Sequence, residues 1–261
     1  MIMELNKNNN LQAASKIINK ILNVDNILCF GERSLTSSRD SVFQKTALIQ
    51  NRAYYHLMVI SETEVKDILQ LQNEVNDQLD QSLAISLLVH TEDEIAHALS
   101  NDSRFFHKIF QRADQMYLQS RFSRLSCNSP AAEPANVLMI WQDHYQKAVA
   151  FHESAGILLG IDDNSASLNL IIQSLEHAST GLLQACLDYQ PKHSDLNYVL
   201  PICNILSSQL ENIFPCKTLI GENHFQLSED PFTVFFLHQQ CVEWIKAARQ
   251  VVQQARHAGH M

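Results

Sequence analysis

Apolar residues follow different patterns in the two halves of the chain. In roughly the first half, short apolar runs alternate with segments in which apolar residues recur every three or four positions. The runs predict buried strands, and the recurring spacing predicts helices. The predicted strands cover residues 27–30, 53–60, 82–90 and 116–118, and the predicted helices cover 11–22, 62–79, 91–99 and 104–112. Strands that alternate with helices indicate a small α/β domain.

The second half has helical spacing almost throughout. Its longest amphipathic segment begins at Ala166 and is ended by Pro191, because proline disfavours the helical conformation of the residue before it. The apolar stripe of this segment consists of Leu168, Ile171, Ile172, Leu175, Ala178, Leu182, Cys186 and Tyr189. Further helices are predicted over about 136–159, 198–213 and 231–255, and the first should bury Leu138, Trp141, Tyr145, Ala148, Val149, His152, Ala155 and Leu159. Four such helices predict a bundle.

A small, polar segment with two prolines separates the halves. Such a composition is typical of a linker. We therefore predict an α/β domain over residues 1–125, a linker over 126–134 and an all-α bundle of four to five helices over 135–258. Within the first domain, the polar stretch 34–40 predicts a loop, and Thr91 followed by Glu94 predicts a capped helix start.

Composition is that of a soluble globular protein, with 46% apolar and 18% charged residues. No apolar run approaches the roughly 18 residues of a membrane span, and the N-terminus lacks the apolar block of a signal peptide. We therefore expect a cytoplasmic protein with no membrane partner. The six cysteines form no Cys-x-x-Cys pair, so reduced thiols are expected rather than disulfides or a zinc site.

The net charge of −9 is unevenly distributed. Residues 1–125 carry 13 Lys and Arg against 15 Asp and Glu, whereas residues 126–261 carry 6 against 13. A nucleic-acid surface needs clustered basic side chains that displace counterions from phosphate. Nucleic acid is therefore not expected as a partner of the helical bundle.

The helical half contains Gln173-Ser174-Leu175-Glu176 on its central helix, then Tyr189-Gln190-Pro191-Lys192-His193-Ser194-Asp195-Leu196 at the following turn. These residues resemble the HEPN family, prokaryotic four- to five-helix bundles of nucleotide- and RNA-related systems. That family often has Gln-Ala-x-Glu, then Tyr-x-Pro-Lys-x-His-Asp-Leu; here serine replaces the alanine, and His193 stands one place early. The resemblance covers about residues 136–254 and implies a bundle that pairs with a second copy.

The first half is similar to the minimal nucleotidyltransferase domain that accompanies HEPN bundles. In that family the first strand ends in Phe-Gly-Ser, and the second carries Asp-x-Asp, whose carboxylates hold metal ions on a triphosphate. Here Phe30-Gly31 is followed by Glu32, and Tyr54 and His56 occupy the aspartate places. The resemblance therefore implies the family's frame without its metal-binding carboxylates, and we predict no catalytic residue, metal site or cofactor.

The ribonuclease motif of HEPN bundles, arginine followed after four to six residues by histidine, does not occur in the sequence. Arg249 and His257 have seven residues between them, and other arginine–histidine pairs have two or three. Glu176–His177 remains open as a functional pair, although Glu176 as a solvated or interhelical hydrogen-bonding group is favoured.

The leading hypothesis is a non-catalytic regulatory protein, from bacteria, that binds a nucleotide or another small anionic ligand and forms a homodimer through its bundle. The candidate ligand-binding residues are Gly31, Arg33, Ser34, Tyr54, His56, Lys192 and His193. One alternative is an active nucleotidyltransferase of a toxin–antitoxin or defence system, with relocated carboxylates from Glu32 or Asp40. A second alternative is a ribonuclease that uses an unconventional Arg249–His257 pair.

Overall fold

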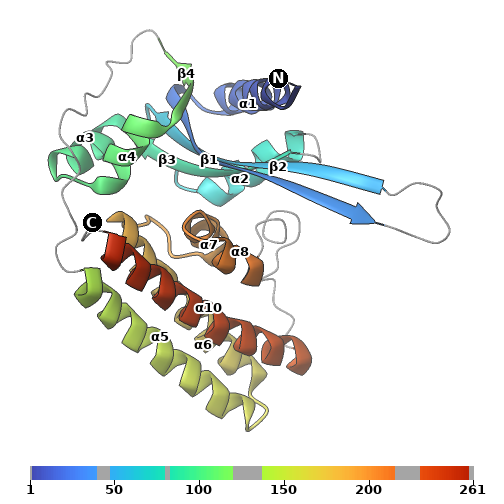
Figure 1. Ribbon diagram of the computed structural model, residues 1–261, viewed down its shortest axis with the longest axis vertical. Coiled ribbons are helices and arrows are strands. Elements are labelled where there is room, and N and C mark those ends of the chain that lie inside the picture. Colours follow the sequence, from blue (N-terminus) through green and yellow to red (C-terminus); the bar gives the residue numbers. More distant parts are fainter. Residues whose placement is uncertain (1, 40–47, 80–82, 120–136, 215–229, 259–261) are drawn as a thin grey trace. The chain divides into compact units, whose positions relative to one another are not determined.

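The computed structural model describes residues 2–39, 48–79, 83–119, 137–214 and 230–258. The chain divides into two compact units, Met1–Ala131 and Ala132–Met261, which are called here the N-terminal and C-terminal units. The N-terminal unit combines a mixed sheet with helices, and the C-terminal unit is helical (Figure 1). The predicted order of an α/β part followed by a helical part is thus confirmed. The predicted linker, residues 126–134, lies outside the described residues.

The sheet of the N-terminal unit has four strands in the order β3-β2-β1-β4. Strand β2 pairs antiparallel with β1 and parallel with β3, and β4 pairs antiparallel with β1. The elements in chain order are α1 (Ile2–Ile21), β1 (Val24–Arg39), β2 (Leu48–Ser61), α2 (Ile68–Gln78), β3 (Leu83–Thr91), α3 (Glu92–Ser100), α4 (Arg104–Arg112) and β4 (Asp114–Leu118).

The predicted loop over residues 34–40 is wrong as far as Arg39, because β1 continues through this stretch as half of a long ribbon with β2 (Figure 1). Ser34 pairs with Ala53 and Arg39 pairs with Leu48. Backbone pairing with a partner strand overrides the low strand preference of serine, because strand preference depends strongly on context. The two strands are therefore consecutive neighbours in the sheet, whereas α2 links β2 to β3, and α3 and α4 link β3 to β4.

Local sequence accounts well for the helix starts and for the outer edge of the sheet. The capping box predicted at Thr91 is present, with Glu94 N donating to Thr91 Oγ1 at 3.3 Å and Thr91 N donating to Glu94 Oε2 at 3.0 Å.

Helix α2 begins later than predicted, at Ile68. Its Asn76 side chain bonds both backbone groups of Ile85, and Gln72 Oε1 accepts from Leu87 N. These polar side chains of α2 satisfy backbone groups on the outer edge of β3, which α2 covers.

The C-terminal unit consists of α5 (Val137–Leu159), α6 (Asn164–Leu187), α7 (Leu196–Asn204), α8 (Ser208–Ile213) and α10 (Pro231–Ala258). The single helix predicted over 198–213 is wrong: it is two helices, because Ser207 caps a new start by accepting from Gln209 N. The predicted burial of Leu138 is also wrong, since this side chain is exposed. Helix α6 ends at Asp188 in the left-handed conformation, before Pro191.

Helices α5 and α6 approach each other closely along small residues spaced by seven. Ser167 Oγ donates to Ala155 O at 2.9 Å, and Ser174 Oγ donates to Ala148 O at 2.6 Å. Gly181 continues the series against His144. These hydroxyls bond the partner helix directly, so the contact buries polar groups without leaving them unsatisfied. No described helix is long and apolar enough to cross a membrane.

Candidate functional site

Three residues, one from each of the strands β1, β2 and β3, lie in one row across the sheet. Gly31 on β1 is the register partner of His56 on β2, and His56 is the register partner of Ser86 on β3. A register irregularity between Cys29 and Gly31 places the glycine opposite the imidazole. We call Gly31, His56 and Ser86 the strand row. It contains no carboxylate.

Close approach explains why glycine stands in the strand row. A Cβ atom added at Gly31 would lie 3.0 Å from His56 Cδ2, which is closer than carbon atoms normally pack. Among the described glycines none has a positive φ, so a left-handed backbone conformation does not account for Gly31. The glycine is required because the imidazole passes directly over its backbone.

Burial decides the protonation state of His56. The side chain is 5% exposed, and its Nδ1 has no hydrogen-bond partner among the described residues. Desolvation by burial lowers the pKa of His56 to about 3, because the charged imidazolium cannot be solvated there. His56 is therefore neutral at physiological pH, and it supplies neither a cation for phosphate nor an anion for a magnesium ion.

Aromatic rings surround the strand row within the N-terminal unit. The His56 ring lies 4.8 Å from the Tyr54 ring and 5.9 Å from the Phe30 ring, measured between centroids. Phe30 in turn contacts Phe105 of α4 at 6.0 Å, and Phe105 contacts Phe106 at 5.3 Å. Edge-to-face pairs of this kind stabilise a packed core. The place where the resemblance expects metal and triphosphate holds an apolar cluster.

Arg33 and Glu32 lie on different faces of β1. Arg33 is the register partner of Tyr54 and therefore shares a face with Gly31 and His56, whereas Glu32 pairs with Tyr55. Successive side chains of a strand point to opposite faces, so the Glu32 carboxylate points away from the strand row. The side chain of Ser34 and all of Asp40 lie outside the described residues. Within the described residues, no three His, Cys, Asp or Glu side chains form a group that could hold a metal ion.

Lys192 and His193 belong to the C-terminal unit, in the turn between α6 and α7. His193 is exposed and places its ring edge-on against Tyr198 at 5.9 Å. The Tyr198 hydroxyl lies 3.2 Å from that of Tyr189, and both tyrosines are buried. The buried tyrosine pair fixes the shape of the turn that carries the two basic residues.

Glu176 and His177 are neighbours in sequence on α6, and both are half-buried. Burial, followed by the charge of Asp195, raises the pKa of Glu176, whereas burial and then His144 lower the pKa of His177. His177 stacks on Phe151 with ring centroids 5.4 Å apart. The two residues thus face different neighbours, Asp195 and Phe151, and no contact between them supports a functional pair.

Two histidines of the bundle form a pair that sequence spacing did not reveal. The rings of His152 on α5 and His238 on α10 stack with centroids 3.9 Å apart, and each Nε2 donates to the backbone carbonyl of the other. Burial and the neighbouring His238 lower the pKa of His152. The stacked pair joins the two helices.

A further polar site that sequence analysis did not single out is a groove of about 480 Å³ between α1 and β4. Five of its residues, Gln12, Ser15, Lys16, Asn19 and Lys20, follow helical spacing along one face of α1. That spacing was visible in the sequence, but the opposite wall, Met116 and Tyr117, comes from a strand far along the chain.

No protein-family model matches the chain, and no curated protein matches it. Among solved structures, the chain is similar to the crystal structure of a nucleotidyltransferase-like protein from Exiguobacterium sibiricum 255-15. The two sequences are 12% identical, and the match covers 94% of this chain and 74% of the other at a TM-score of 0.29. A likeness at this TM-score does not establish a common fold.

Proposed function

We propose that this chain is a non-catalytic regulatory protein that binds a nucleotide or another small anionic ligand. In this proposal the N-terminal unit is a nucleotidyltransferase-like domain that has lost its chemistry, and the C-terminal unit is a HEPN-like bundle that pairs with a second copy. The strand row is the observation that carries the proposal.

Metal-dependent nucleotidyl transfer needs anionic oxygen ligands that hold Mg²⁺ against the triphosphate. At the positions in question the chain has a glycine, a neutral buried imidazole and a buried hydroxyl. Imidazole is a poor ligand for Mg²⁺, which prefers near-octahedral oxygen coordination, and one neutral hydroxyl does not replace two carboxylates. The aromatic cluster around His56 further opposes the entry of a charged triphosphate, because burial of unpaired charge is strongly unfavourable.

Incubation of the full chain with labelled ATP and either Mg²⁺ or Mn²⁺, with RNA and with proteins as acceptors, tests this proposal. We expect no transfer of label above a reaction that contains EDTA. Metal-dependent transfer that is lost in Glu32→Ala would instead establish the alternative enzyme with relocated carboxylates.

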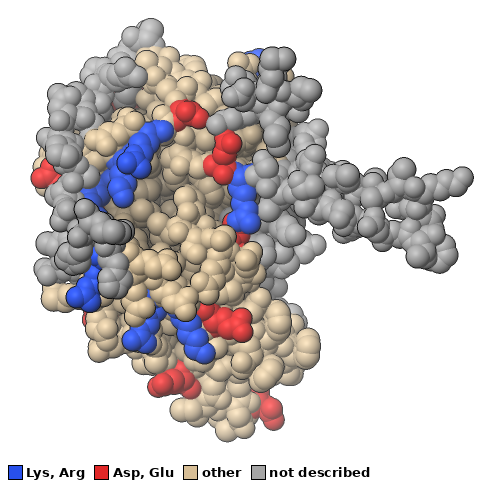
Figure 2. Space-filling model, in the orientation of Figure 1, with Lys and Arg blue, Asp and Glu red and all other residues tan. Residues whose placement is uncertain are grey.

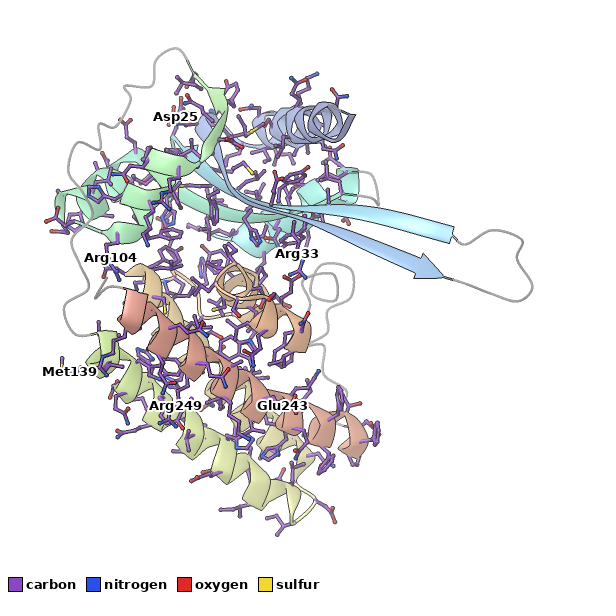
Figure 3. All side chains as sticks on the ribbon, viewed as in Figure 1. Asp25, Arg33, Arg104, Met139, Glu243 and Arg249 are labelled. Carbon is purple, nitrogen blue, oxygen red and sulfur yellow. The ribbon has the colours of Figure 1, made fainter. Side chains whose placement is uncertain are left out.

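Among the described residues of the C-terminal unit, no contact supports ribonuclease chemistry by Arg249; the side chain of His257 lies outside them. Its guanidinium lies over the Tyr145 ring at 5.3 Å, and its Nη1 donates to the Tyr145 hydroxyl at 3.4 Å (Figure 3). Arg249 thus joins α10 to α5, a structural role. On the face shown in Figure 2, charged side chains over these helices are few, with both signs interspersed. Such a surface lacks the clustered positive charge that RNA binding requires.

Pairing with a second copy is supported by exposed apolar side chains at one end of the bundle. The first turns of α10 expose Phe232, Phe235 and Phe236 by 78%, 55% and 54%. Ile157 near the end of α5 and Ile161 in the turn that follows are exposed by 71% and 69%. These two helix ends lie together, because a Cβ at Gly156 would be 3.2 Å from His238 Nε2 (Figure 1). We call these five side chains the apolar end.

The area of the apolar end fits a dimer contact. At about 200 Å² for each full side chain, it exposes roughly 600 Å², at the upper end of the roughly 300–600 Å² of the largest apolar patch on a typical monomer. A standard interface buries about 800 Å² on each partner, of which a polar rim supplies part. A two-fold contact between identical apolar ends would thus reach the size of a specific interface.

Sedimentation velocity of the full chain over a wide concentration range tests the dimer. We expect a dimer that is converted to monomer by the double substitution Phe232→Glu and Phe235→Glu. The matched control is Met139→Glu, an equally exposed apolar residue near the start of α5, which should leave the dimer intact. A monomer at every concentration, or a dimer that survives the double substitution, would contradict this part of the proposal.

A further inference from the structure

The groove between α1 and β4 combines positive charge, hydrogen-bonding groups and one aromatic ring. Lys16 and Lys20 lie one helical turn apart on α1, with Gln12 and Asn19 on the same face. Tyr117 and Met116 of β4 form the other wall. No aspartate or glutamate is among the described residues that line the groove. The groove thus presents two cations without a countercharge of its own.

Ser15 gives an independent sign that the groove is incomplete as it stands. The residue lines the groove but is only 6% exposed, and its Oγ has no hydrogen-bond partner among the described residues. A buried hydroxyl without a partner is unfavourable, and such groups in folded proteins require an explanation. A hydrogen-bond acceptor in the groove would satisfy the hydroxyl after rotation of the side chain about its Cα–Cβ bond.

Helix stability explains only part of this arrangement. Lys20 lies in the last turn of α1, where a cation interacts favourably with the helix dipole. That effect fades within the last turn, and it accounts for neither the buried hydroxyl of Ser15 nor the aromatic wall. The combination of groups therefore points to a ligand.

We infer that this groove binds a small phosphorylated compound that carries a planar ring. The two ammonium groups bind the phosphate as mobile point charges, which is how lysine usually recognises phosphate. The Tyr117 ring offers a stacking surface for the planar group, and the amides of Gln12 and Asn19 offer donors and acceptors for its edge. A volume of about 480 Å³ falls within the usual range of small-molecule sites.

The inference rests on the proposed function, because it gives a location to the anionic ligand of that proposal. That location is the groove and not the strand row. Three probes separate the parts of the ligand. AMP carries both phosphate and ring, ribose 5-phosphate carries the phosphate without the ring, and adenosine carries the ring without the phosphate. Isothermal titration of the full chain should rank AMP as the tightest of the three.

Charge-matched variants then test the location. In Lys16→Gln with Lys20→Gln, the Kd for AMP should rise by roughly tenfold or more, because both charge-assisted contacts to the phosphate are lost. Lys66→Gln with Lys246→Gln removes the same charge from two other exposed lysines and should leave the Kd nearly unchanged. Tyr117→Leu should remove the advantage of AMP over ribose 5-phosphate.

The failure of the inference is distinguishable from the failure of the proposed function. Unchanged AMP affinity in the groove variant would place the ligand elsewhere and overturn the inference alone. Affinity lost equally in both double variants would indicate attraction by overall charge and would also overturn it. If the unmodified chain bound none of the three probes, the inference would fall together with the binding part of the proposed function.

Discussion

The substitution Gly181→Ala tests the close packing of α5 against α6. A Cβ atom at Gly181 would collide with the Cβ of His144 and lie 2.8 Å from its Cγ, well inside the 3.5–4.0 Å or so at which carbon atoms pack. Overpacking lowers stability by about 1–3 kcal/mol, and a collision this close with two atoms belongs in the upper part of that range. The better helix propensity of alanine offsets about 1 kcal/mol of the cost. We therefore expect the free energy of unfolding of the C-terminal unit to fall by about 1–2 kcal/mol.

Tryptophan fluorescence isolates this unit, because both tryptophans of the chain, Trp141 and Trp244, are buried in α5 and α10. With a urea dependence of about 2 kcal/mol per molar, the midpoint of unfolding should fall by roughly 0.5–1 M. The control is Gln146→Ala on the exposed face of α5, which should change stability by no more than about 0.5 kcal/mol.

A glycine swap identifies the collision as the cause. In a His144→Gly background the colliding side chain is absent, so Gly181→Ala should no longer destabilise the unit. A double-mutant cycle over these two sites gives the coupling energy directly. If Gly181→Ala were as stable as the unmodified chain, or if its effect were the same in both backgrounds, the close α5–α6 contact would be refuted.

Three further predictions concern titration and burial. Burial lowers the pKa of His56 to about 3 from 6.5, so between these pH values the unfolded state binds more protons than the folded state. The free energy of unfolding should therefore fall below about pH 6.5, and by about 2–3 kcal/mol at pH 4.5. Thermal unfolding followed by circular dichroism should show a weaker acid effect in His56→Leu. The pKa of His152, which lies near Glu153 and Lys246, is also lowered, so acid should destabilise the C-terminal unit in the same way. The urea midpoint of the tryptophan signal should be lower at about pH 5 than at about pH 7, and the difference should be smaller in His152→Gln. Ser15→Ala should leave the melting temperature unchanged or raise it, because the hydroxyl that it removes is buried without a partner among the described residues. The same substitution should weaken AMP binding by a few fold. A loss of stability would show that the hydroxyl is satisfied within the protein.

Much of the fold could be predicted from sequence because it depends on local patterns. The continuous apolar run over 53–60 lies within the buried part of β2, and the capping box at Thr91 starts α3 where it was expected. Helical spacing located α5, α6 and α10 because each buries one long face. These features depend on residues close together in the chain.

Features that depend on partners distant in sequence could not be predicted. The polar residues 34–39 continue β1 only because residues 48–53 pair with them. The spacing of Ser167, Ser174 and Gly181 was present in the sequence, but its meaning depends on the small residues of α5. The replacement of carboxylates by Tyr54 and His56 was visible, whereas the aromatic packing that makes His56 neutral required Phe30 and Phe105 to be placed in space.

The central claim, binding without metal-dependent transfer, is tested most directly by a thermal-shift panel of nucleoside mono-, di- and triphosphates, each with and without Mg²⁺. A ligand that binds only the folded state raises its melting temperature by an amount that increases with the logarithm of the ratio of ligand concentration to Kd. Since the strand row has no carboxylates, we predict that any stabilisation by a nucleotide is the same with and without Mg²⁺. Stabilisation that appears only with Mg²⁺ would require a carboxylate metal site and would contradict the proposed function.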